Sequence, residues 1–137
     1  PLFGSDNDRS CVLRVAGRGG SLLLTGDTEA AGEQWLGRHA DLRADVVLVA
    51  HHGSSTSSTA AFVAATGARH ALVSAGFLNR WAHPRPDVVA RWQDAGATVW
   101  RTDRHGALRV VGGSVSAERR SRWPFVWRLP ATVGTGR

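Results

Sequence analysis

The chain has 137 residues, 42% hydrophobic and 20% charged, which is the balance of an ordinary globular domain and excludes a fully disordered or collagen-like chain. No apolar run approaches the roughly 18 residues of a membrane-spanning helix, and a single cysteine, Cys11, excludes an internal disulfide. The N-terminal residues show no signal-peptide pattern, and the chain contains no methionine, so we expect a segment of a longer protein.

The chain is basic, but its charge is unevenly distributed. All 17 basic residues are arginines, and with 11 acidic residues they give a formal net charge of +6. Residues 113–137 carry a net charge of +4, and residues 1–112 carry the remaining +2. The basic character therefore belongs mostly to the C-terminal segment, and it is weak evidence that the rest of the chain binds nucleic acid.

The first half of the chain alternates between strand and helix patterns. A helix is expected from residue 29 to about residue 38, and a second helix, capped by Ser57 or Ser58, is expected to end near residue 65. Runs of apolar and β-branched residues bounded by turn formers predict strands at residues 10–16, 21–25, 45–50 and 71–74.

Residues 75–83 form a loop that is long for a compact domain, which makes it a candidate functional segment. Pro84 and Pro86 are expected to open a helix that Gly96 ends. A closing pair of strands is predicted at residues 97–100 and 107–111.

The resulting order, β-β-α-β-α-β-α-β-β, predicts an α/β fold with a largely buried sheet. After residue 111 the alternating pattern gives way to a Gly/Ser segment and then to a mixture of Arg, Trp and Pro. We therefore expect a folded domain over residues 1–112 and a poorly ordered basic tail over residues 113–137.

Polar side chains gather at the ends of the predicted strands. Asp27 follows the second strand, His51 and His52 follow the third, and His83 closes the loop after the fourth. In open α/β sheets, ligands bind beyond the carboxyl ends of the strands. Since imidazole and carboxylate groups suit Zn, Mn or Fe, this edge of the sheet is a candidate metal site.

Four segments of the sequence resemble one family. They are Leu-Leu-Leu-Thr-Gly-Asp at residues 22–27, Val-Ala-His-His-Gly-Ser at 49–54, Asn-Arg-Trp-Ala-His-Pro at 79–84 and Asn-Asp-Arg-Ser-Cys-Val-Leu at 7–13. Together they resemble the C-terminal, metallo-β-lactamase-like domain of the DNA-internalisation competence protein ComEC. The resemblance runs from about residue 7 to residue 111, and it implies the second half of the αββα metallo-β-lactamase fold.

This resemblance implies a metal-dependent hydrolase that cleaves DNA phosphodiester bonds and degrades the strand that is not imported. The complete domain would hold a two-metal site containing Mn or Zn. Carried over by matching position, the roles are metal ligands at Asp27 and His51, catalytic groups at His52 and His83, and phosphate contacts at Gly53, Ser54 and Asn79.

The implied partners are single- or double-stranded DNA, the first half of the same domain, other competence proteins and, through the parent protein, a membrane. The implied location is a soluble domain of an inner- or plasma-membrane protein, on the non-cytoplasmic side.

The sequence departs from the family in one respect. The His-x-Asp-x-Asp-His motif, which supplies the principal metal ligands of the family, does not occur in this chain. We therefore expect the chain to be the distal half of the domain and to be inactive alone. Two alternatives stay open, a non-catalytic DNA-binding half-domain and a different hydrolase of the metallo-β-lactamase fold.

Each candidate residue also has a purely structural interpretation. Asp27 could cap the helix that follows it, the paired histidines could be satisfied by backbone hydrogen bonds, and His83 could simply begin a helix. For Trp81, in the long loop, side-chain packing is preferred over stacking on a base. The Arg/Trp tail could contact phosphates or a membrane interface, although a poorly ordered extension is the preferred interpretation.

Overall fold

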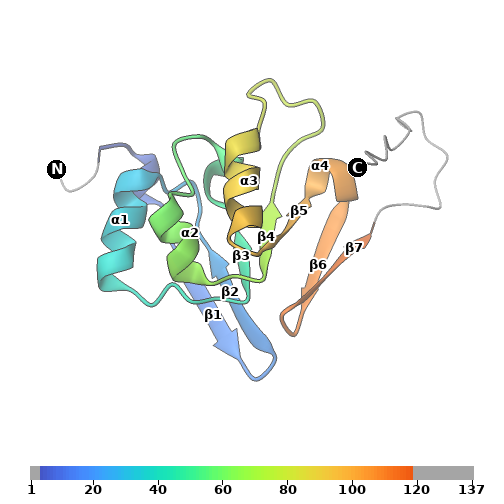
Figure 1. Ribbon diagram of the computed structural model, residues 1–137, viewed down its shortest axis with the longest axis horizontal. Coiled ribbons are helices and arrows are strands. Elements are labelled where there is room, and N and C mark those ends of the chain that lie inside the picture. Colours follow the sequence, from blue (N-terminus) through green and yellow to red (C-terminus); the bar gives the residue numbers. More distant parts are fainter. Residues whose placement is uncertain (1–3, 119–137) are drawn as a thin grey trace.

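A five-stranded sheet forms the centre of the computed structural model, which describes residues 4–118 (Figure 1). The strand order is β1-β2-β3-β4-β5, with β1 antiparallel to β2 and the other neighbours parallel. The strands are β1 (Leu13–Gly17), β2 (Gly20–Leu24), β3 (Val46–Leu48), β4 (His70–Val73) and β5 (Thr98–Arg101). The α/β fold class predicted from the sequence is therefore confirmed.

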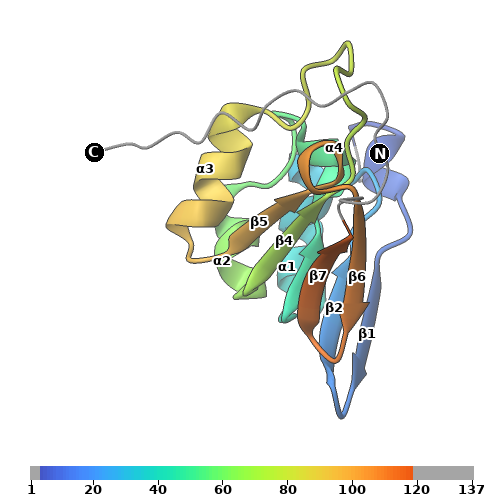
Figure 2. The same ribbon diagram turned by 90° about the vertical axis from the view of Figure 1, so that its right-hand side faces the viewer.

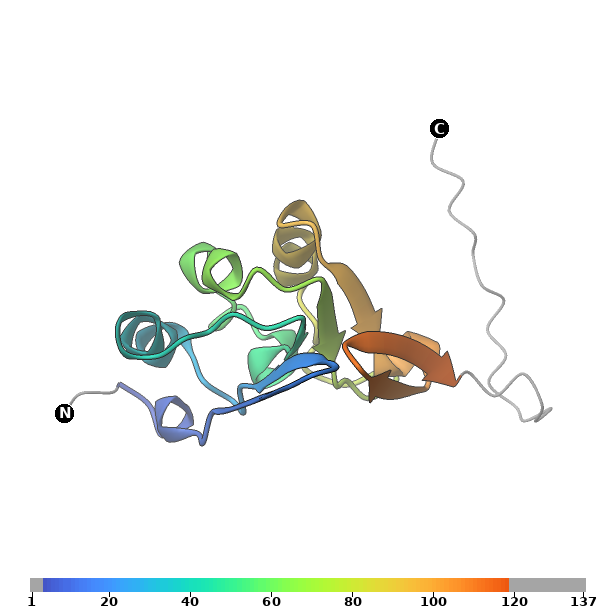
Figure 3. The ribbon, with the colours of Figure 1, turned by 90° about the horizontal axis from the view of Figure 1, so that it is seen from below.

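Three helices cover one face of this sheet, as seen from below in Figure 3. They are α1 (Ala30–His39), α2 (Ala60–Thr66) and α3 (Pro86–Asp94). The core lies between these helices and the sheet, where Leu23, Val47, Val73, Val88 and Trp92 are each at most 3% exposed. Because parallel strands need a crossover between them, each helix returns the chain to the same end of the sheet. All the connections that leave β2, β3 and β4 therefore start from one edge.

A separate hairpin lies on the opposite side of the sheet from α2 and α3 (Figure 2). It consists of β6 (Ala107–Val111) and β7 (Ser114–Glu118), and the short helix α4 (Thr102–His105) connects it to β5. The tips of two hairpins touch, because a Cβ atom on Gly19 would lie 3.0 Å from Cα of Gly112. Strand β1 stays exposed along its whole length, and Leu13 is 55% exposed.

The structure corrects the predicted end of the domain. Strand β5 does not pair with residues 107–111 as expected but joins the main sheet beside β4, while β6 pairs with β7. The sequence interpretation ended the folded part at residue 112, and the structure continues it through β7 to Glu118. The rest of the predicted tail, residues 119–137, lies outside the described residues.

Two predicted helix starts are also corrected. The N-cap of α2 is Thr59, whose hydroxyl accepts a hydrogen bond from the Phe62 amide, whereas Ser57 and Ser58 are buried before the helix. Helix α3 begins at Pro86, so Pro84 lies outside it and forms a cis peptide bond with His83. Both errors have the same cause. Several neighbouring residues have side chains suited to a helix cap or a first turn, and tertiary contacts determine at which of them the helix begins.

Candidate functional site

The structure brings the predicted histidines and Asp27 together at the carboxyl edge of the sheet. Asp27 follows β2, and His51 and His52 lie in the 3-10 turn η2 (Ala50–Gly53) that follows β3. His52 Nε2 lies 3.9 Å from Asp27 Oδ1, and the rings of His51 and His83 are 6.1 Å apart between centroids. The backbone amide of His51 donates to the carbonyl of Gly26, which joins the ends of the two strands.

Asp27 does not act as the cap of the helix that follows it. Helix α1 begins at Ala30, and the carboxylate of Asp8, in the 3-10 helix η1 (Asn7–Arg9), accepts the amides of Glu29 and Gly32 at 2.9 Å each. An acidic group close to the first turn of a helix satisfies amides that have no partner inside the helix. Asp8 therefore has the capping role that the sequence left open for Asp27. The Asp27 carboxylate is directed instead to the carboxyl edge of the sheet where His51, His52 and His83 lie, which we call the histidine edge.

The two histidines stand on a strained turn of backbone. His51, His52 and Gly53 have φ angles of 49°, 55° and 78°, all in the left-handed region. That region costs about 1–2 kcal/mol for each residue other than glycine. Strain of this kind persists where the surrounding structure holds it, and it gathers at functional sites. Here the amide of Ser54 donates to the carbonyl of His51, closing the turn.

Gly53 allows the segment before α3 to reach the histidines. A Cβ atom at Gly53 would lie 2.6 Å from Cβ of Pro84, closer than side chains approach one another. The amide of Arg85 also donates to the carbonyl of Gly53. This close contact places His83, the residue before Pro84, against His51 although β4 separates them in the chain.

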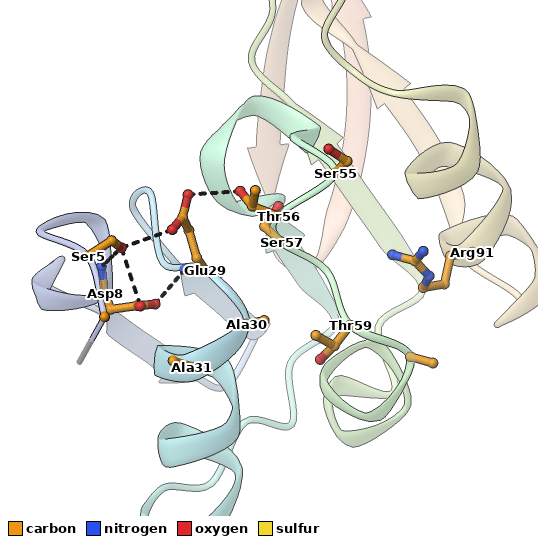
Figure 4. A pocket seen from close by; sticks show the side chains of 12 residues that line it. Ser5, Asp8, Glu29, Ala30, Ala31, Ser55, Thr56, Ser57, Thr59 and Arg91 are labelled. Carbon is orange, nitrogen blue, oxygen red and sulfur yellow. Dashed lines mark hydrogen bonds between the residues drawn. The ribbon is translucent and has the colours of Figure 1, made fainter. Parts of the chain in front are cut away.

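Glu29 joins the site through His51, a contact that the sequence interpretation missed. Its carboxylate Oε1 lies 3.2 Å from Nδ1 of His51 and accepts the hydroxyl of Thr56 at 2.8 Å. Ser5 donates to the other oxygen (Figure 4). The hydrogen bond from Thr56 does most to hold the pKa of Glu29 below its usual value, and hydrogen bonds from Ser5 and Asn7 and the charge of His51 lower it further.

This contact places a carboxylate oxygen beside Nδ1 of the His51 ring. A carboxylate in that position favours the tautomer with its hydrogen on Nδ1, which leaves the lone pair on Nε2, the nitrogen that a metal would bind. The only sequence signal was that Glu29 stands two residues after Asp27, where it was assigned to the start of a helix. The contact itself depends on how α1 and η2 meet in the fold.

His52 is oriented in a similar way by a backbone carbonyl. Its Nδ1 lies 2.8 Å from the carbonyl oxygen of Ser74, which can only accept a hydrogen bond. Nε2 then carries the lone pair and faces Asp27. The side chains of His52 and Asp27 are about half exposed, at 53% and 49%, so this pair is open to a ligand from solution.

His83 differs from the other two histidines because its Nδ1 is buried and, within the described residues, has no hydrogen-bond partner. Burial lowers the pKa of His83, and the nearby charges of His51, His52 and Arg85 lower it further. The ring is therefore favoured in its neutral form. A neutral imidazole keeps a lone pair on one ring nitrogen, and that nitrogen can accept a proton.

The residues predicted to contact phosphate are engaged within the protein. Ser54 is 6% exposed, and its hydroxyl lies 3.0 Å from that of Thr56. The Asn79 amide group donates to the carbonyl of His83 at 2.6 Å and accepts its amide at 2.9 Å. Asn79 therefore holds the backbone of His83 in place, and phosphate binding by Gly53, Ser54 and Asn79 stays a prediction.

The described residues do not make a complete metal site. The donors are of suitable types, but residues 4–118 contain no group of three or more His, Cys, Asp or Glu side chains placed to hold an ion. A protein metal site needs at least three such ligands. Metal binding by Asp27 and His51 therefore stays a prediction.

Comparison with known proteins finds relatives among competence proteins. Competence protein ComA of Neisseria gonorrhoeae is 39% identical over 127 residues, covering 90% of this chain and 18% of the relative. ComE operon protein 3 of Bacillus subtilis is 38% identical over 110 residues, covering 80% and 14%. These matches support a place in the competence-protein family. Recombination protein 2 of Haemophilus influenzae is 37% identical over 106 residues, covering 77% of this chain and 13% of that protein.

The chain therefore spans less than a fifth of the length of these curated competence-protein relatives. No family model matches it, and no solved structure matches it. Within the described part of the chain, no helix is both long enough and apolar enough to cross a membrane.

Proposed function

We propose that this chain is the distal half of a metallo-β-lactamase-like domain that hydrolyses DNA phosphodiester bonds during DNA uptake. In this proposal Asp27 and His51 are ligands for Mn or Zn, and the remaining ligands come from the first half of the domain. The domain belongs to a membrane protein, lies on its non-cytoplasmic side and degrades the strand that is not imported.

The observation that carries the proposal is the convergence of three histidines and two carboxylates at one edge of the sheet. His52 has its Nδ1 bonded to the Ser74 carbonyl, and Glu29 Oε1 lies 3.2 Å from Nδ1 of His51. Both Nε2 atoms are thereby left for an external ligand. The relatives named as competence proteins support DNA as the substrate class.

A non-catalytic DNA-binding half-domain is the second candidate. It is favoured by the absence of a three-ligand group among residues 4–118 and by the net charge of +4 that residues 113–137 carry. The two candidates differ in whether the carboxyl edge binds a metal once the rest of the domain is present.

Titration calorimetry with Mn²⁺ and Zn²⁺ tests the proposal. The samples are this chain and, where its gene encodes a preceding segment, the longer chain, each also as the Asp27→Ala and His51→Ala variants. We expect only the longer chain to bind metal. In that chain, the Asp27→Ala and His51→Ala variants should each lose metal affinity by well over the roughly 10- to 100-fold that is typical when a residue supporting a metal ligand is altered.

The matched control is His39→Ala, which removes an exposed histidine on α1. Metal affinity and DNA cleavage should be unchanged in that variant. Equal metal affinity of the wild type and both edge variants would contradict the assignment of ligands. DNA binding without any metal binding by the longer chain would favour the non-catalytic candidate.

A further inference from the structure

We propose that the loop between β4 and α3, residues 75–83, is a stacking surface for the bases of single-stranded DNA beside the histidine edge. The inference rests on the proposed function, because it assigns the surface that would present the strand to that edge. It concerns a different part of the molecule from the candidate metal ligands.

The loop carries three of the seven large apolar side chains that are exposed among the described residues, including Leu78, the most exposed of them. Leu78 is 81% exposed, Trp81 is 60% exposed and Phe77 is 52% exposed. The packing role that the sequence interpretation preferred for Trp81 is therefore wrong, because the ring stands largely in solvent. Figure 1 shows the loop projecting beyond the ends of β4 and α3, away from the helix-covered core. Exposed aromatic side chains grouped in this way mark a binding surface rather than a core.

The loop is held in shape although its side chains are exposed. Asn79 accepts the amide of His83 and donates to the carbonyls of Gly76 and His83. Leu78 and Ala82 take left-handed backbone angles of 51° and 54°, which are uncommon for residues other than glycine. Because the loop is already ordered, its aromatic rings can bind a ligand with little further loss of conformational entropy.

The charge around the rings suits a phosphate backbone. The guanidinium carbon of Arg80 lies 4.2 Å from the ring centroid of Trp81. Arg85 follows in the same connection and is exposed, and residues 75–86 contain no acidic side chain. Arginine beside an aromatic ring is a recurring combination in proteins that bind single strands, where the ring stacks on a base and the cation attracts the phosphates.

The position of the loop favours a single strand over other partners. Trp81 is two residues from His83, whose ring faces His51. A base stacked on the loop would therefore bring its own phosphodiester chain towards the histidine edge. Bases in a duplex are covered by their neighbours, so only an unpaired strand offers its ring faces.

Equilibrium binding of a fluorescein-labelled oligothymidylate of about 16 nucleotides tests the inference. The Phe77→Ala/Trp81→Ala variant should bind at least about 10-fold more weakly than the wild type, since stacking accounts for much of single-strand affinity. Trp81→Phe, which keeps a ring, should retain most of the affinity. Arg80→Gln should reduce the slope of log affinity against log salt by about 0.7.

The matched control is Trp35→Ala, because Trp35 is also surface-exposed, at 39%, but lies on α1 away from the loop. Its affinity for the oligonucleotide should equal that of the wild type. The same affinity in the Phe77→Ala/Trp81→Ala variant, or no binding by the wild type, would overturn the inference. Loss of binding to anionic phospholipid vesicles with unchanged oligonucleotide binding would also overturn it, and would assign the loop to a membrane surface.

The outcome is separable from that of the metal titration. If the metal ligands are wrongly assigned, oligonucleotide binding that depends on Trp81 would still establish the loop as a strand-binding surface. If the loop is wrongly assigned, metal binding that depends on Asp27 and His51 would be unaffected.

Discussion

Two connections at the carboxyl edge of the sheet differ in how much of their side-chain surface is exposed to solvent. The turn after β3, residues 50–58, buries five of its nine residues, and the hydroxyls of Ser54 and Ser57 are hydrogen-bonded within the protein. Ser57, for example, is 2% exposed and donates its hydroxyl to the carbonyls of Ala50 and Ser54. The loop after β4, residues 75–83, exposes its largest side chains to solvent.

This difference indicates a division of roles between the buried turn and the exposed loop. The buried turn fixes the rings of His51 and His52 in one orientation, and a site built on such a turn needs little rearrangement to bind a ligand. The exposed loop contributes little to the core, and its exposed side chains are available to contact a binding partner. Substitutions in or under the buried turn should therefore affect stability, whereas those at the loop tip should affect binding alone.

The largest effect on the buried turn is expected from Glu33→Ala. Glu33 is 1% exposed, and its carboxylate accepts the amides of Ser58 and Thr59 just before α2. Alanine leaves the buried Ser58 amide and the partly buried Thr59 amide without this partner, which should lower the free energy of unfolding by about 3–4 kcal/mol. Urea denaturation measures this, with Gln34→Ala on the exposed face of α1 as the control, expected to change it by less than about 0.5 kcal/mol. Equal midpoints for the two variants would contradict this account.

A smaller but still marked loss is expected from Gly53→Ala. The new methyl group would meet Pro84 at 2.6 Å, and alanine would have to adopt a φ of 78°. The two effects together should lower the free energy of unfolding by about 2–3 kcal/mol. Gly76→Ala is the control, because its Cβ atom would lie 3.9 Å from Asn79 in ordinary contact. If thermal denaturation shows the same loss for both glycines, the close approach of Pro84 is not what requires glycine at position 53.

The smallest effect is expected in how the free energy of unfolding depends on pH, through His83 in the exposed loop. Because burial lowers the pKa of His83, the unfolded chain binds a proton below about pH 6.5 while the folded chain resists it. The free energy of unfolding should therefore fall as the pH is lowered from about 6.5, by less than about 1.4 kcal/mol per pH unit. His83→Gln should reduce this slope in denaturation curves recorded across that range. An identical slope in the variant would show that His83 is not the group that resists protonation.

The main strands and helices were predictable because their patterns are local. The run Ser21–Thr25 is apolar and the chain turns at glycines on either side, so β2 was placed within one residue. Strand β7 was missed, because Ser114–Glu118 has little apolar character, and its partner β6 provides the pairing that makes it a strand. Thr59 was likewise chosen as a cap by tertiary contacts, because Glu33 already binds the amides of Ser58 and Thr59.

The sequence by itself determined that Asp27, His51 and His52 would meet at one edge, since all three directly follow strands that topology forces to run parallel. Only the tertiary structure decided how these side chains are held. The contact of Glu29 with His51, the capping of α1 by Asp8 and the approach of Pro84 to Gly53 join segments far apart in the chain. The exposure of Trp81 was decided in the same way. Hydrogen bonds, close contacts and burial depend on how whole helices and strands pack together. The local pattern of residues along the sequence does not specify that packing.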